Sequence, residues 1–129
     1  MKMMIVEDSE VVRGVLRNLL SQVNGVALTG EFANAESAIA GVRDNPPDAM
    51  LLDIQLNAGN GMDVLHVVAQ ECPDTQVFVV TNHIDEVYRA RYLRAGACAF
   101  FDKSRELGLL RRHLQKLSSN LETSVAGKQ

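Results

Sequence analysis

The segment Ala49-Met50-Leu51-Leu52-Asp53 is the most informative stretch of this 129-residue chain. Four apolar residues follow one another without alternation, and a carboxylate comes directly after them. Strands that are buried on both faces have this pattern, because helices cover both sides of a parallel sheet. Similar short apolar runs span residues 3–6, 26–28, 77–80 and 97–101. The run at 26–28 is more mixed in composition than the others, so we expect it at an edge of the sheet.

Helical patterns separate these runs. Apolar residues recur at a spacing of three or four positions within residues 16–23, 35–42, 62–69, 87–93 and 107–117. Strands that alternate with helices of this size predict right-handed crossovers. The predicted fold is therefore α/β: a flavodoxin-like, doubly wound, five-stranded parallel sheet with strand order 2-1-3-4-5. Residues 1–118 form the predicted domain, and residues 119–129, which lose the periodicity, are predicted to be a frayed C-terminal tail.

Charge and composition narrow the functional classes. The chain has 13 Lys and Arg and 16 Asp and Glu, a net charge of −3, which argues against direct nucleic-acid binding. No apolar run approaches the ~18 residues that span a bilayer, and the first run is too short for a signal peptide. We therefore expect a cytoplasmic protein without a membrane segment. Cys72 and Cys98 lack metal-binding spacing and are expected to be reduced and buried.

Polar residues follow four of the five predicted strands. Glu7 and Asp8 follow the first, Asp53 the third, Thr81 ends the fourth, and Lys103 comes just after the fifth. Ligands of doubly wound sheets bind beyond the carboxyl ends of the strands, so these side chains should share one pocket. Clustered carboxylates recruit a cation, and oxygen donors favour Mg²⁺. This set predicts phosphoryl transfer onto a carboxylate, although a single acid such as Asp8 could instead cap a helix.

In order and spacing, six motifs resemble the receiver domain of bacterial two-component response regulators. The resemblance covers residues 2 to about 118 of the chain. The motifs are Ile5-Val6-Glu7-Asp8-Ser9, Leu51-Leu52-Asp53-Ile54, Asn60-Gly61, Val79-Val80-Thr81, Ala95-Gly96-Ala97 and Phe100-Phe101-Asp102-Lys103.

The resemblance implies that Asp53 is the phosphoacceptor. Its donor would be a sensor histidine kinase or a histidine phosphotransfer protein. The domain would then be a signalling switch and not an enzyme, with at most self-phosphotransfer and slow autodephosphorylation. The metal site implied for Mg²⁺ consists of Glu7, Asp8, Asp53 and the main-chain carbonyl of Gln55.

The resemblance also implies the residues of the switch. Thr81 and Lys103 would contact the phosphoryl oxygens, and Phe100 would be the aromatic that turns inward after phosphorylation. Gln55 and His83 lie where the family tunes the attacking water, so both are expected to affect the lifetime of the phosphoryl group.

Several positions depart from the common family pattern. Asn57 replaces a frequent Pro, so the loop after the acceptor should be freer. Asn82 is bulkier than the small residue usual there, which narrows the route to the acceptor. Ser104 also replaces a frequent Pro, so we expect a trans peptide bond before it and a cap on the fifth helix. Phe100 stands in place of the frequent Tyr and has no hydroxyl to hold it at the surface, which favours the inward position.

Two surfaces are predicted to bind partners. The first helix has more apolar residues than one buried stripe needs, so Val12 and Val15 are candidates for docking the kinase, with an extended core contact as the alternative. The face made by the fourth helix, fifth strand and fifth helix would meet a downstream protein target. Tyr88, Arg91 and Tyr92 are its predicted contacts, and the same face could form a homodimer.

Three other interpretations deserve comparison. A Mg²⁺-dependent hydrolase with an Asp nucleophile needs a second Asp two residues on, where this chain has Gln55. A flavodoxin-like cofactor binder needs a phosphate-binding loop after the first strand, where Glu7-Asp8-Ser9-Glu10 would repel phosphate. A phosphorylation-independent, receiver-like protein-binding module stays open as the alternative function.

Overall fold

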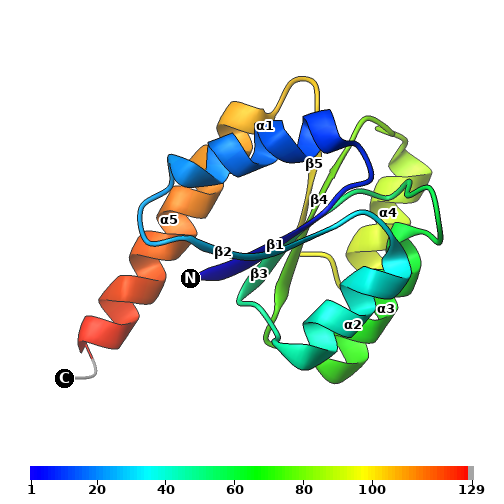
Figure 1. The fold of residues 1–129 in the computed structure, drawn as a ribbon. Coiled ribbons are helices and arrows are strands. Elements are labelled where there is room, and N and C mark those ends of the chain that lie inside the picture. Colours follow the sequence, from blue (N-terminus) through cyan, green and yellow to red (C-terminus); the bar gives the residue numbers. More distant parts are fainter. Residues whose placement is uncertain (128–129) are drawn as a thin grey trace.

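A single five-stranded parallel sheet organises the molecule, with strand order β2-β1-β3-β4-β5 as the sequence predicts (Figure 1). The computed structural model describes the backbone of residues 1–127 and the side chains of residues 1–121. The elements are β1 (Lys2–Val6), α1 (Glu10–Ser21), β2 (Ala27–Phe32), α2 (Ala35–Asp44), β3 (Ala49–Leu52), α3 (Gly61–Glu71), β4 (Gln76–Thr81), α4 (Glu86–Arg94), β5 (Ala99–Asp102) and α5 (Leu107–Gly127).

Two apolar cores lie on the opposite faces of this sheet. Successive residues of a strand point to opposite faces, so each continuous apolar run serves both cores. Met4, Met50 and Leu52 pack toward α2, α3 and α4. Met3 and Leu51 pack toward α1 and α5. Figure 1 shows α1 and α5 together on one side of the sheet, with α2, α3 and α4 on the other.

The register of the strands brings the predicted polar residues to one edge of the sheet. Val6 of β1 is paired with Leu52 of β3, so the residues that follow these strands are neighbours. Thr81 at the end of β4 is paired with Asp102 of β5, one residue before Lys103. The carboxyl ends of four strands therefore converge on one site, as the strand order requires.

The last helix differs from the prediction. A frayed tail was expected from residue 119, whereas α5 continues to Gly127. The physical reason is that Leu121 extends the spacing of Leu114 and Leu117, and no proline interrupts the segment before Gly127. The domain boundary at residue 118 stays a prediction.

The cysteines also differ from expectation, because only one is partly buried. Cys72 is half-buried and Cys98 is exposed, just before the edge strand β5. Neither forms a disulfide. Among the described residues, no helix is both long enough and apolar enough to cross a membrane.

Candidate functional site

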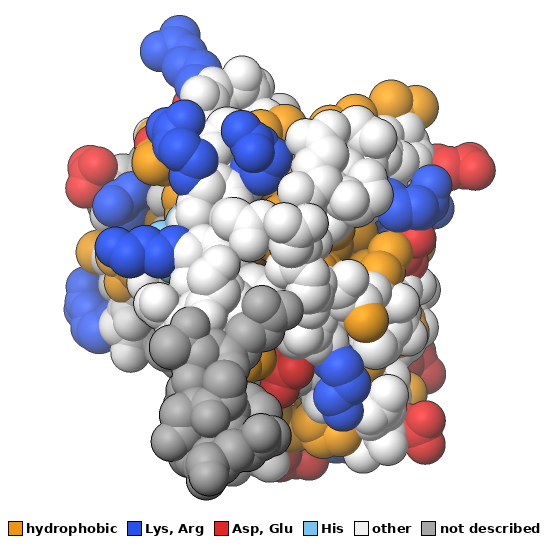
Figure 2. Space-filling view, turned by 90° about the vertical axis from the view of Figure 1, so that its left-hand side faces the viewer, with side chains coloured by type: hydrophobic (Ala, Val, Ile, Leu, Met, Phe, Trp, Pro, Cys, Tyr) orange, Lys and Arg blue, Asp and Glu red, His pale blue; other side chains and the backbone are white. Residues whose placement is uncertain are grey.

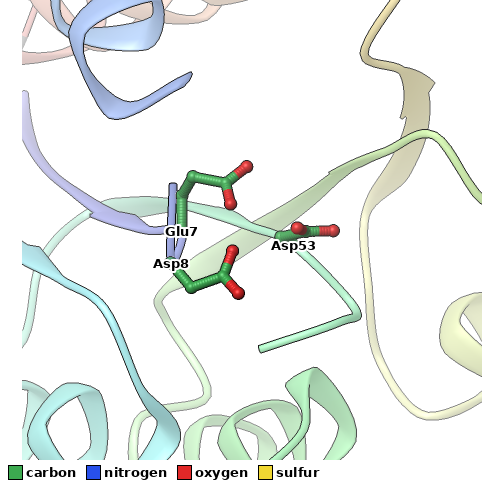
Figure 3. A group of neighbouring side chains, drawn as sticks. All are labelled: Glu7, Asp8 and Asp53. Atoms are coloured by element: carbon green, nitrogen blue, oxygen red, sulfur yellow. The ribbon is translucent and has the colours of Figure 1, made fainter. Parts of the chain in front are cut away.

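Three carboxylates meet where β1 and β3 end (Figure 3). Glu7 and Asp53 directly follow these two strands, and Asp8 comes next along the chain. Carboxylate oxygens of the three residues lie within 4.8 Å of one another. Glu7 is only 1% exposed, and Asp53 is buried as well. The structure therefore brings together the three acids that the sequence places at one edge of the sheet.

Lys103 supplies the positive charge of this cluster. Its ammonium group forms an ion pair with Glu7 and a second one with Asp53, at 3.1 Å between Nζ and Oδ2. Burial alone would lower the pKa of Lys103, but the hydrogen bond that Lys103 donates to Glu7 and the charge of Asp53 outweigh it and raise the pKa. Burial raises the pKa of Glu7, although its hydrogen bond with Lys103 opposes the shift. Lys103 thus remains a cation facing both carboxylates.

The loop between β1 and α1 is held by two polar side chains. The hydroxyl of Ser9 accepts a hydrogen bond from the Val12 N–H at 3.2 Å, so Ser9 and not Asp8 caps α1. Arg13 donates from Nη1 to the carbonyl oxygens of Glu7, at 2.8 Å, and Asp8, at 3.2 Å. This role of Arg13 was not predicted from the sequence. Its position in the second turn after the cap is the only local sign, since side chains there point back toward the helix start.

Thr81 closes the other side of the site. Its side chain is fully buried, and its Oγ1 accepts a hydrogen bond from the His83 N–H at 3.2 Å. A cavity of about 220 Å³ opens over the acids, and Gln55, Thr81, Asn82 and His83 all contribute to its lining. The two residues expected to tune the phosphoryl lifetime, Gln55 and His83, therefore line the same cavity as Asp53.

Two departures from the family pattern contact each other. The hydroxyl of Ser104 donates to Oδ1 of Asn82 at 2.7 Å and thereby joins the loops that follow β4 and β5. The prediction that Ser104 caps α5 is wrong, because the helix begins at Leu107 and the hydroxyl is engaged with Asn82. The predicted trans peptide bond before Ser104 is confirmed, since residues 1–127 contain no cis peptide bond.

The loop after the acceptor is tied down more firmly than the sequence indicates. Asn57 led us to expect a freer loop, but the next carbonyl, that of Ala58, accepts a hydrogen bond from the Ala35 N–H at 3.1 Å. Gly59 adopts a φ of +80°. A Cβ there would lie 2.6 Å from that of Ala35, so glycine permits both the turn and the close approach to α2.

The fourth helix places one predicted contact residue in the core. Tyr92 is 4% exposed, so its assignment to a partner surface is wrong. It is the only buried side chain of α4, and burial raises its pKa to about 12. Tyr88 and Arg91 are exposed, as the prediction requires. Phe100 is also buried, at 5% exposure, with the Arg89 guanidinium 5.9 Å from its ring centre.

The valines of α1 are divided between core and solvent. Val11 is 78% exposed and Val15 is 47% exposed, which confirms that valines of this helix face solvent. Val12 is half-buried and packs against the core formed with α5. The alternative of an extended core contact therefore describes Val12, whereas Val11 and Val15 are the accessible residues.

Comparison with known proteins identifies the class. The sequence matches the response regulator receiver domain family over residues 3–115, so the chain belongs to this family. It is a receiver domain of a two-component response regulator, which implies phosphorylation-based signalling. Receiver domains are signalling phosphoacceptors and not conventional enzymes. They generally bind Mg²⁺ at an acidic pocket and interact with histidine kinases or phosphotransfer partners.

Its relatives are longer proteins. The chain is 27% identical over 100 residues to the response regulator UvrY of Escherichia coli (strain K12), covering 78% of this chain and 46% of UvrY. It is 30% identical over 106 residues to the transcriptional regulatory protein YhcZ of Bacillus subtilis, covering 82% and 50%, respectively. The chain thus spans about half the length of the curated relatives it matches.

Solved structures share the same fold. The response regulator domain of Thermotoga maritima CheB gives a TM-score of 0.81 at 20% identity, covering 93% of this chain and 94% of that one. A chain of the CheX–CheY–BeF₃⁻–Mg²⁺ complex from Borrelia burgdorferi gives a TM-score of 0.82 at 19% identity, covering 90% of this chain and 87% of that one. These likenesses establish the receiver fold of the chain.

Proposed function

We propose that Asp53 accepts a phosphoryl group from a histidine of a sensor kinase or phosphotransfer protein. The observation that carries this proposal is the burial of its carboxylate at the end of β3, 3.1 Å from Lys103 and beside two further acids. In the transfer, an Asp53 oxygen forms a bond to phosphorus while the phosphorus–nitrogen bond to the donor breaks. The electron pair of that bond stays on the donor imidazole, which takes up a proton.

The donor set fits a hard divalent cation. Glu7, Asp8, Asp53 and the main-chain carbonyl of Gln55 would hold Mg²⁺, because carboxylate and carbonyl oxygens are the ligands it prefers. When bound, the ion neutralises charge on the transferring phosphoryl group. The Arg13 hydrogen bonds fix the loop that presents Glu7 and so orient the site in advance.

Lys103 and Thr81 would stabilise the phosphorylated state. Lys103 already lies against Asp53 and would contact a phosphoryl oxygen with its ammonium group. The Thr81 hydroxyl accepts a hydrogen bond from His83 but keeps its own proton to donate to another phosphoryl oxygen. Movement of Thr81 toward the phosphoryl group would leave space, and Phe100, which is 5% exposed, would fill that space and hold the inward state.

The consequence of phosphorylation would be read at two surfaces. Helix α1 begins at Glu10, two residues after Asp8, and its exposed valines, Val11 and Val15, would meet the kinase or phosphotransfer protein. The face of α4, β5 and α5, which includes Tyr88 and Arg91, would meet the downstream target. A phosphorylation-independent binding module would use the same surfaces without chemistry at Asp53, and the next experiment separates the two functions.

The test is phosphorylation by acetyl phosphate in the presence of Mg²⁺, followed by intact-mass spectrometry. We expect the mass increase of one phosphoryl group in the wild type and its loss in Asp53→Asn or after addition of EDTA. Asp74→Asn is the matched control, because Asp74 is exposed before β4, at the opposite ends of the strands. A folded wild type that gains no mass, or a gain that persists in Asp53→Asn, would contradict the proposal. Absence of any gain would favour the binding module.

A further inference from the structure

Positive charge is concentrated in the last third of this chain. Residues 1–84 contain four Lys and Arg against eleven Asp and Glu, a net charge of −7, whereas residues 85–129 contain nine against five, a net charge of +4. Helices α4 and α5 make up most of the positive segment. Figure 2 shows Lys and Arg side chains gathered on the left of that view, with Asp and Glu mostly along its right and lower margins. An anionic partner would therefore be drawn toward this part of the chain.

The arginines of α4 border two different neighbours. Arg89 lies toward β5, because its guanidinium is 5.9 Å from the ring centre of Phe100 and donates to the carbonyl oxygen of that residue at 3.5 Å. Arg91 and Arg94 instead border α3, where both line a hollow together with Met62. The space between α3 and α4 therefore receives two cations of α4.

Two adjoining hollows form a groove between α3 and α4, which lie on the same side of the sheet (Figure 1). Gln55 and His83 contribute to the lining of the first hollow, which has a volume of about 260 Å³. His66 of α3 contributes to the lining of the second, which has a volume of about 310 Å³. Met62 and Arg91 line both hollows, so the two form one surface, which we call the α3–α4 groove.

The cations of this groove have no counter-ion within the described part of the molecule. Neither Arg91 nor Arg94 has a carboxylate within 4.0 Å among the side chains described for residues 1–121, and no described Asp or Glu lines either hollow. The hollow between α2 and α3 is different, because acidic side chains line it and its Arg43 pairs with Glu71 at 2.7 Å. The α3–α4 groove is therefore open to an external anion.

The groove also has an apolar lining and adjoins the acceptor. Met62 and Ala95, both half-buried, contribute apolar surface to it. Apolar contacts add burial to charge attraction, so this combination suits a protein partner. Gln55 and His83 line both the first hollow and the cavity over Asp53. A segment bound in the groove would therefore lie beside the acceptor cavity.

We propose that the α3–α4 groove binds an acidic segment of a partner protein, whose carboxylates pair with Arg91 and Arg94 and whose apolar side chains cover Met62. The bound segment restricts access to Asp53, because it lies against residues that also line the acceptor cavity. This inference rests on the proposed function. It adds the chemistry of a partner that regulates phosphorylation, on a surface separate from α1 and β5.

A protein segment fits this groove better than a free anion or a second copy of the chain. A single phosphate ion would occupy one hollow and leave the other uncovered. A twofold symmetric contact places the same surface on both sides, so it would set Arg91 and Arg94 of one copy against those of the other. Side chains spaced along an acidic segment can enter both hollows and satisfy both the charge and the apolar lining.

Fluorescence anisotropy with a labelled synthetic peptide of Glu and Leu tests binding to the full, unphosphorylated chain. We expect R91E/R94E to weaken binding about tenfold, because the reversal replaces two attractions by two repulsions. H66E, on the α3 wall of the groove, should weaken binding about fivefold. The matched control R112E/K116E makes the same change in net charge as R91E/R94E at exposed positions of α5, on the other face of the sheet, and should alter binding less than about twofold.

Four results would overturn the proposed binding. Equal binding of a control peptide with every Glu replaced by Lys would contradict the charge argument. Weaker binding by R91E/R94E with wild-type binding by H66E would place the peptide on the exposed side of α4 and not in the groove. Displacement of the peptide by an equal concentration of inorganic phosphate would assign the site to a free anion. Self-association of the chain that R91E/R94E abolishes would assign it to a second copy.

Access to Asp53 is measured as the rate of phosphorylation by acetyl phosphate, followed by intact mass. At a saturating peptide concentration, we expect this rate to fall at least about threefold in the wild type and to fall less in R91E/R94E, because the bound segment covers the cavity. An unchanged rate in the wild type would refute the control of access.

Phosphorylation of the free chain tests the proposed function separately. A phosphorylated chain without groove-dependent binding would refute only this inference. Groove-dependent binding by a chain that gains no phosphoryl group would refute only the phosphoacceptor role of Asp53.

Discussion

Gly61, the first residue of α3, is the point at which an added methyl group would disturb the acceptor most directly. A Cβ at this position would lie 2.6 Å from the carbonyl oxygen of Asp53 and 2.9 Å from the Cα of Ile54. Both contacts are to backbone atoms, which cannot rotate away as a side chain can. The φ of Gly61 is not positive, so alanine could adopt its backbone conformation. Any loss of stability in Gly61→Ala must therefore come from the contact itself.

The size of the effect follows from these distances. Ordinary contacts of a Cβ begin at 3.4 Å, so the methyl group and the Asp53 carbonyl must separate by about 0.8 Å. Overpacking of this kind costs about 1–3 kcal/mol of the free energy of unfolding. For a domain of this length, that loss lowers Tm by roughly 3–15 °C. A displaced acceptor backbone should also slow phosphorylation at least about tenfold, since transfer depends on sub-ångström positioning.

Thermal unfolding and the rate of phosphorylation by acetyl phosphate measure the two effects. Gly14→Ala is the matched control, because Gly14 lies inside α1 and a Cβ there meets nothing within 4 Å. We expect Gly14→Ala to gain about 0.5–1 kcal/mol of stability from the better helix former. If Gly61→Ala melts at or above the wild-type temperature and is phosphorylated at the wild-type rate, the argument from close approach is wrong.

Three further predictions concern a buried phenol, the lifetime of the phosphoryl group and kinase docking. Burial raises the pKa of Tyr92 from 10.0 to about 12, so the unfolded chain loses this proton first and stability falls as the pH rises between these values. Urea midpoints measured between about pH 9 and 11 should therefore fall less steeply in Tyr92→Phe than in the wild type. Replacement of Gln55 or His83 by Ala should change the decay rate of the phosphorylated protein, and unchanged decay in both variants would contradict their role. Val15→Asp should slow phosphotransfer from a kinase more than from acetyl phosphate, whereas Val12→Asp should mainly lower Tm, because Val15 is exposed and Val12 is half-buried. Equal slowing with both donors by Val15→Asp would argue against docking.

Some parts of the site could be predicted from the sequence because they depend on local pattern. Continuous apolar runs such as 49–52 identify buried parallel strands, and the residue after each run lies at the carboxyl edge of the sheet. The convergence of Glu7, Asp53 and Lys103 therefore followed once the strand order was known. The exposure of valines on α1 also followed, since one helix face cannot bury six apolar positions.

The burial and hydrogen bonds of several side chains could not be predicted. Their contacts are made by residues distant in the sequence, or by one of several polar groups that lie nearby. Tyr92 is buried because it packs against the start of α3, and no spacing within α4 indicates this contact. Ser104 does not cap α5, because Asn82, twenty-two positions away, accepts its hydroxyl proton. Arg13 turns inward to the loop carbonyls although its helix position also suits a surface arginine. For each of these three side chains, the groups that contact it come from elsewhere in the fold or from the neighbouring loop, and only their positions in space show which contact forms.

The sequence by itself determined the sheet order, the acidic site and the excess of positive charge in residues 85–129, because all three are properties of order and composition. The tertiary structure decided which charged side chains are exposed and which form ion pairs. It left the exposed cations of α4 and α5 without a carboxylate within 4.0 Å among the described side chains. Pairing and burial are set by distances between elements far apart in the chain, so only the folded arrangement separates Arg17 and Arg43, which pair with carboxylates, from the exposed arginines of α4 and α5.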